Sequence, residues 1–125
     1  MILLLDAHVV LWALGEPERL APGVAESLAS PANDVLVSVG SIWEIDIKRA
    51  LGKLRIERDL LAALDGARMD IVSITGPDAV AAARLPAHHR DPFDRMLVAQ
   101  AARLDATVVS RDAVFDDYGT ARLPA

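Results

Sequence analysis

Short apolar runs alternate along the chain with segments of helical spacing. Residues 2–5 are consecutive apolar side chains that end at Asp6, a pattern typical of a strand buried on both faces. The β-branched and apolar run at 107–110 predicts a second such strand, followed closely by Asp112. Three further strands are predicted at 35–37, 71–74 and 121–123. Five short strands are therefore expected.

Helical segments lie between these runs. Apolar spacing predicts a helix over 7–14, which ends at Gly15. Asp91 followed by Pro92 predicts the start of the longest helix, 92–104, because an acid suits the capping position and proline suits the first helical position.

The remaining helices complete a regular alternation. Ser38 or Ser41 is expected to cap a helix that ends at Leu51, because Gly52 follows it. The other helices are predicted at 22–29, at 59–67 and from 76–78 to the residues before Pro86. This order of elements predicts one α/β domain over residues 1–125, with a parallel sheet flanked by helices on both faces.

Composition narrows the possible functions. The 125 residues include no cysteine, which excludes zinc ribbons, thiol enzymes and disulfide scaffolds, and positive mean hydropathy (+0.29) argues against disorder. The formal charge of −5 argues against a general nucleic-acid coat, so a nucleic-acid role would need a local site. Because Asp6 interrupts the first apolar run and no run approaches membrane-spanning length, we expect a cytoplasmic protein without a membrane segment.

Four acids are placed where a parallel sheet binds its ligands. Asp6 and Asp112 follow two predicted strands, while Glu44 and Asp94 lie in the first turns of helices. Ligands of open α/β sheets bind at the carboxyl ends of the strands, so these acids are expected to converge. Converging carboxylates repel one another unless a cation compensates them, and Mg²⁺ or Mn²⁺ accepts such oxygen ligands. Two ions about 4 Å apart would support phosphodiester hydrolysis.

Each acid also has a purely structural explanation. Asp6 is suited to cap the helix that follows it, and Asp112 is suited to cap a helical turn. Glu44 stands four residues before Lys48, the favourable order for a helical ion pair. Asp94 occupies the first turn of 92–104, where the helix dipole favours an acid, but it borders the apolar stripe and there needs a compensating charge.

The other polar and aromatic candidates are less specific. Residues 48–58 carry five basic side chains against one acid, which is either a solvated helix end or a phosphate-binding strip. His88 and His89 lack the spacing of a zinc motif and are interpreted as a surface loop or RNA contact. Trp12 and Trp43 are interpreted as core or interface residues.

Taken together, four ordered motifs resemble the PIN-domain ribonucleases, and most closely the VapC-type toxins of bacterial toxin–antitoxin pairs. The motifs are LLLDAH at 3–8, SVGSIWEIDIK at 38–48 with GKL at 52–54, HRDPFDRMLVAQA at 89–101 and VSRD at 109–112. They occur in the family's order and span nearly the whole chain.

The resemblance implies specific roles. The family's metal-binding acids, which hold Mg²⁺ or Mn²⁺ and a nucleophilic water, correspond to Asp6, Glu44, Asp94 and Asp112. Supporting or substrate-contacting roles fall on Ser110, Asp91, Arg95 and Lys48. It also implies a homodimer, an RNA substrate, a cognate VapB-type antitoxin, and cleavage that leaves 3′-hydroxyl and 5′-phosphate ends.

The leading hypothesis is therefore a metal-dependent endoribonuclease toxin. One alternative is a PIN-like nuclease that acts in RNA processing or on DNA. Another is a Mg²⁺-binding phospho-receiver module, although Asp6 lacks the neighbouring acid that receivers carry and the third predicted strand ends without an aspartate. A protein that only binds its target is the remaining alternative.

Overall fold

Five parallel strands form one sheet in a computed structural model that describes all 125 residues. The strands are β1 (Ile2–Leu5), β2 (Asp34–Ser38), β3 (Asp70–Val72), β4 (Thr107–Ser110) and β5 (Arg122–Pro124). Their order in the sheet is β3-β2-β1-β4-β5, and every pairing is parallel. The predicted α/β class and parallel sheet are confirmed.

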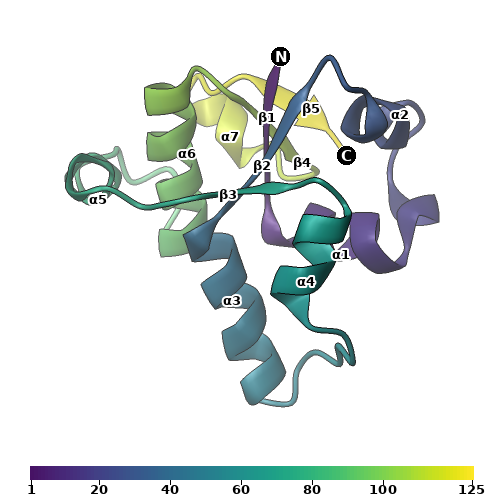
Figure 1. Cartoon of the computed structure of the whole chain (residues 1–125). Helices are drawn as coiled ribbons and strands as arrows, with labels where there is room; N and C mark the ends of the chain where they lie inside the picture. Colours follow the sequence, from purple (N-terminus) through teal and green to yellow (C-terminus); the bar gives the residue numbers. More distant parts are fainter.

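Helices cover both faces of this sheet. They are α1 (Ala7–Gly15), α2 (Val24–Ala29), α3 (Val39–Ala50), α4 (Leu60–Gly66), α5 (Gly76–Ala83), α6 (Pro92–Leu104) and α7 (Val114–Asp117), with a 3₁₀ turn, η1 (Pro17–Arg19). Figure 1 shows α5 and α6 to one side of the strands and α1 and α2 to the other.

The side chains of β1 explain this two-sided arrangement. Leu3 and Leu5 pack into a core that includes Val9 of α1 and Leu64 of α4. Leu4 points to the opposite face and joins a second core with residues of α6 and with Phe115 of α7. Because successive side chains of a strand alternate between faces, an unbroken apolar run is required when both faces are buried.

The register of the sheet aligns the carboxyl ends of its three central strands. Leu5 pairs with Val37 of β2 and with Val109 of β4. The main-chain N–H of Asp6 then donates to the carbonyl of Val109 at 3.2 Å. The loops that follow β1, β2 and β4 therefore emerge at one edge of the sheet.

Several predicted boundaries shift for local reasons. The helix predicted over 22–29 begins at Val24, because Gly23 adopts a left-handed conformation (φ 85°) that is incompatible with a continuous helix. The strand predicted over 71–74 spans Asp70–Val72, since its partner β2 ends at Ser38, opposite Val72. Ser38 is the cap of α3.

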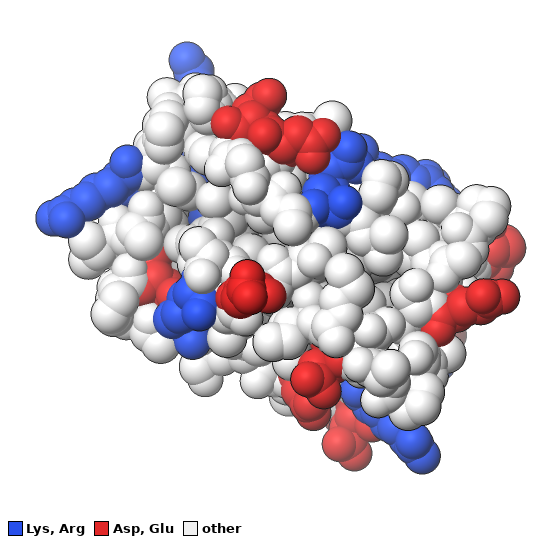
Figure 2. Space-filling view, turned by 90° about the horizontal axis from the view of Figure 1, so that it is seen from above, with Lys and Arg blue, Asp and Glu red and all other residues white.

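The end of the molecule at which β1 begins carries no dominant charge. Figure 2 shows acidic and basic side chains interspersed on this face among uncharged residues. No helix is both long and apolar enough to span a bilayer.

Candidate functional site

Asp6 is fixed in place by the helix that it starts. Its extended backbone (φ −76°, ψ 169°) ends β1, and its Oδ1 accepts a hydrogen bond from the N–H of Val9 at 2.9 Å. The residue is only 8% exposed. The capping interpretation is thus confirmed, and Oδ2 makes no hydrogen bond within the chain, so capping leaves this oxygen available to a ligand.

Asp94 lies in the first turn of α6, whose start is set by a second aspartate. Asp91 caps this helix by accepting hydrogen bonds from the N–H groups of Phe93 (2.8 Å) and Asp94 (3.4 Å). The pKa of Asp94 is raised to about 6, chiefly by burial and to a smaller extent by the negative charges of Asp91 and Asp6, while a hydrogen bond from His89 opposes the shift. Asp94 is therefore a partly buried acid whose charge the chain does not fully compensate.

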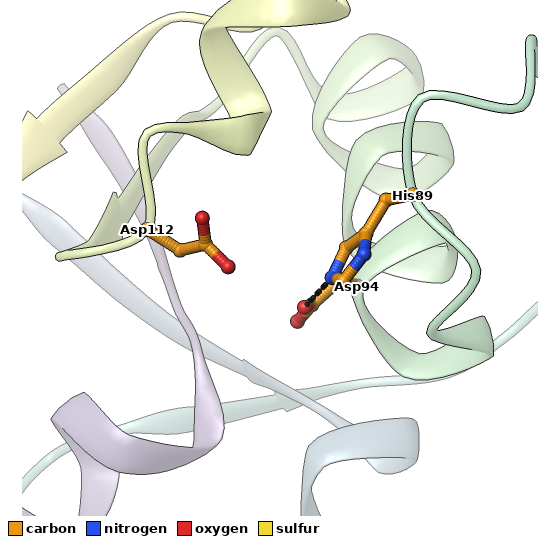
Figure 3. Close-up of side chains that lie close together, drawn as sticks. All are labelled: His89, Asp94 and Asp112. Carbon is orange, nitrogen blue, oxygen red and sulfur yellow. Dashed lines mark hydrogen bonds and ion pairs between the residues drawn. The ribbon is translucent and has the colours of Figure 1, made fainter.

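Asp94 lies beside His89, and both face Asp112 across a small gap (Figure 3). The His89 Nε2 and Asp94 Oδ2 atoms are 2.7 Å apart, and one ligand atom from each of the three side chains lies within 4.8 Å of the other two. Asp112 comes from the loop after β4 and accepts a hydrogen bond at 3.0 Å from the N–H of Val114, the first residue of α7, although the N-cap of that helix is Ala113. We call this group the His89–Asp94–Asp112 cluster.

Ser110 supports the cluster from the end of β4. Its side chain is fully buried, and its Oγ accepts a hydrogen bond from the N–H of Asp112 at 3.0 Å. This bond fixes the direction in which the chain leaves the strand. Ser110 and Asp91 thus orient the segments that carry the two clustered acids.

Arg95 contacts main-chain carbonyls of the loop that precedes α6. Its Nη1 donates to Pro86 (3.0 Å) and to His89 (3.1 Å), and its Nη2 donates to Leu85 at 2.8 Å and to Ala83 at 3.3 Å. Four carbonyls therefore occupy its terminal nitrogens. This geometry favours an orienting role over the substrate contact that was the other expectation for Arg95.

Glu44 is not part of the cluster. Its side chain is 13% exposed, and its Oε2 accepts from Lys48 Nζ at 3.1 Å, which is the predicted helical ion pair. The expected convergence of the four acids is therefore partial. Asp94 and Asp112 meet, and Asp6 is near enough to raise the pKa of Asp94. Glu44 is instead compensated by Lys48.

The basic residues at 48–58 do not form an unpaired strip. Lys48 and Arg49 form ion pairs with acids of their own helix, and Arg58 donates to the carbonyl of Leu14 at 3.0 Å. Three exposed cations have no ion pair with an acid, namely Lys53, Arg55 and Arg58. The strip is consequently a weaker phosphate-binding candidate than its sequence suggests.

Residues 3–121 match the family model described as "PIN domain". The chain belongs to the PIN-domain family. Its sheet order also rules out the phospho-receiver alternative, since the receiver-type order 2-1-3-4-5 places the third strand beside the first. In this PIN domain, β3 lies at the edge of the sheet.

Solved structures share this PIN fold over almost their whole length. The VapBC2 complex from Rickettsia felis, bound to a DNA fragment from its promoter, aligns with a TM-score of 0.74 at 16% identity, covering 99% of this chain and 98% of that chain. FitAcB from Neisseria gonorrhoeae aligns with a TM-score of 0.64 at 24% identity, covering 98% and 96%. DNA-bound VapBC from Salmonella typhimurium aligns with a TM-score of 0.67 at 16% identity, covering 98% of this chain and 96% of that chain. No curated protein matches the chain.

Two residues of the PIN-domain site were missed by the sequence reasoning. His89 was interpreted as a loop or RNA contact, but it folds back onto the first turn of α6. Tyr118 carries no predicted role, but its hydroxyl accepts from the N–H of His89 at 3.0 Å. The available signal was the position of His89 two residues before the cap Asp91, from which a loop side chain can reach the helix start.

The two tryptophans differ in their surroundings. Trp12 is half-buried against the larger core, whereas Trp43 is 63% exposed and contacts Phe93 edge-on at 5.6 Å between ring centroids. A core role is therefore wrong for Trp43. The interface interpretation remains for it.

Proposed function

We propose that this PIN domain is a metal-dependent endoribonuclease that acts in the cytoplasm as the toxin of a toxin–antitoxin pair. The observation that carries the proposal is the His89–Asp94–Asp112 cluster at the carboxyl ends of the central strands. The similar folds of toxin–antitoxin complexes from several bacteria support the same conclusion.

The donor set fits a divalent cation. Carboxylate oxygens are the ligands preferred by Mg²⁺ and Mn²⁺, and the raised pKa of Asp94 indicates an acid that still needs a compensating charge. The acids proposed to hold the cation are Asp6, Glu44, Asp94 and Asp112. A bound cation would neutralise the phosphate and make a bound water more acidic.

The chain's own residues would orient the reacting groups. Asp91 fixes the first turn of α6, so the carboxylate of Asp94 faces Asp112. Ser110 holds the main chain of Asp112, and the capping bond to Val9 immobilises Asp6. Ligands held by short-range hydrogen bonds need little reorganisation when substrate binds.

The test is cleavage of RNA by the purified protein and its variants. Asp6→Asn and Asp94→Asn are expected to abolish cleavage, whereas Asp65→Asn, at an exposed acid of α4, serves as the matched control. Chelation should stop the wild-type reaction, and Mg²⁺ or Mn²⁺ should restore it. Undiminished cleavage by both variants would refute the proposal, and a parallel DNA substrate separates it from the DNA-nuclease alternative.

We also propose a VapB-type antitoxin as the partner. A groove of about 480 Å³ lies between the end of α1, the 54–58 segment and α4, with Leu11, Leu14, Ile56 and Leu60 among its lining residues. Such an apolar groove suits an amphipathic helix. Co-expression with the product of a small adjacent gene should yield a stable complex that lacks nuclease activity, and failure of every neighbouring product to bind would contradict this assignment.

A homodimer is the third part of the proposal. Edge strand β3 exposes Ile71 (47%), and Val80 of α5 is also exposed (48%). An exposed edge strand with an apolar side chain can pair with a second chain. Light scattering should give the mass of two chains for the wild type and of one chain for Ile71→Lys, and a monomeric wild type would refute the dimer.

A further inference from the structure

The main chain of His89, in the loop before α6, is hydrogen-bonded through both its N–H and its carbonyl. The N–H of His89 donates to the Tyr118 hydroxyl at 3.0 Å, and its carbonyl accepts from Arg95 at 3.1 Å. The Tyr118 hydroxyl in turn donates to the carbonyl of Pro86 at 2.9 Å. Residues from two separate helical regions thus determine where this loop residue lies.

The imidazole of His89 is hydrogen-bonded to Asp94 on the side of this acid that faces Asp112. Figure 3 shows the ring beside Asp94, with the carboxylate of Asp112 across from them. The side chain of His89 is 28% exposed and that of Asp94 is 21% exposed, so the pair is partly shielded from solvent. Bonds of about 2.1 Å to a six-coordinate cation place ligand atoms roughly 3–4 Å apart. One ligand atom from each of the three side chains lies within 4.8 Å of the other two, which is close to this range.

His88 provides a natural contrast within the same loop. It is exposed, and its ring packs edge-on against Tyr118 at 5.0 Å between centroids. It belongs to no cluster of acids. The loop therefore presents one imidazole to the acids and turns the adjacent one away.

We propose that His89 supplies a directly bound nitrogen ligand to the cation held by Asp94 and Asp112. This inference rests on the proposed metal-dependent function and extends it to the identity of the metal. Mg²⁺ strongly prefers oxygen ligands, whereas first-row transition ions bind imidazole more readily. A His–Asp–Asp centre consequently favours Mn²⁺ over Mg²⁺ more than an all-carboxylate centre would.

The alternative role for His89 is to hydrogen-bond Asp94 from outside the coordination sphere. The two roles differ in whether the ring nitrogen is bonded to the ion. Pulsed electron paramagnetic resonance of Mn²⁺ bound to the full chain measures this directly, because a coordinated nitrogen gives a coupling that changes when histidine is labelled with ¹⁵N. We expect that coupling in the wild type.

His89→Ala and His88→Ala form the matched pair of variants. His89→Ala should lose the nitrogen coupling and bind Mn²⁺ at least roughly tenfold more weakly, with a smaller loss for Mg²⁺. His88→Ala should retain both properties. Circular dichroism and melting temperature establish whether each variant is folded.

The possible outcomes separate the two proposals. Mn²⁺ binding by the wild type without histidine coupling, together with metal-dependent RNA cleavage, would overturn the ligand role and leave the nuclease intact. Retained coupling in folded His89→Ala would also overturn it. If the wild type binds no cation and cleaves RNA without one, both proposals fail.

Discussion

Replacing Asp94 by asparagine should stabilise the metal-free protein while it abolishes activity. The pKa of Asp94 is raised from 3.8 to about 6, mainly by burial, so its charged form is disfavoured in the folded state. Each pKa unit corresponds to about 1.4 kcal/mol, which makes the cost of the carboxylate about 3 kcal/mol at neutral pH. Asparagine removes this cost and can still hydrogen-bond His89.

The effect should be visible as a change in melting temperature. An unfolding entropy of roughly 0.26 kcal/mol/K for a chain of 125 residues converts 3 kcal/mol into about 11 °C. Because solvent reaches part of the side chain, which is 21% exposed, we expect an increase of about 5–10 °C for Asp94→Asn.

The pH dependence follows from the direction of the shift. A raised pKa means that the folded state binds the proton more tightly, so the wild type loses stability as pH rises from about 4 to about 6. The difference between Asp94→Asn and wild type should therefore open over this interval and stay constant above it. Thermal melts in the presence of chelator measure the difference, with Asp65→Asn as control.

A divalent cation should reverse the order of the two melting temperatures, so that the wild type becomes the more stable protein. Ligand binding to the folded state stabilises only the protein that binds it, so Mn²⁺ should raise the melting temperature of the wild type more than that of Asp94→Asn. An Asp94→Asn variant that melts at or below the wild-type temperature at pH 7 in chelator would refute the reasoning.

Three further predictions concern the residues around the site. Arg95→Met should release the loop before α6, speeding its amide exchange and lowering stability by about 2 kcal/mol, whereas exposed Arg84→Met should change neither. Asp78→Ala should lower the melting temperature at pH 7, because the Arg103 side chain lowers the pKa of Asp78 and so stabilises its charged form in the folded protein. The difference in melting temperature from the wild type should narrow as pH falls below about 4, since protonation of Asp78 removes that stabilisation. A difference that does not change with pH would contradict this reasoning. Ser38→Ala should cost about 1 kcal/mol in denaturant unfolding, and an unchanged midpoint would show that the cap of α3 is dispensable.

Local features of this protein were predictable from its sequence. The unbroken apolar run of β1 requires burial on both faces, and alternation with helices then requires a parallel sheet. The caps Asp6 and Asp91, and also Asp112 before α7, accept from N–H groups two or three residues away, although the N-cap of α7 is Ala113. The Glu44–Lys48 pair spans one helical turn. These contacts depend only on spacing along the chain.

Tertiary structure decided which of these residues meet. Asp94 and Asp112 come together because α6 packs on β1 and β4, with Leu97 and Val98 in the same core as Leu4 and Val108, and strand patterns do not specify this contact. His89 reaches Asp94 because Tyr118, 29 residues away in sequence, holds its main chain. Contacts of this length depend on how the sheet is ordered and how helices pack on it, so the sequence by itself determined the candidate acids, and only the folded chain selected the cluster and its histidine.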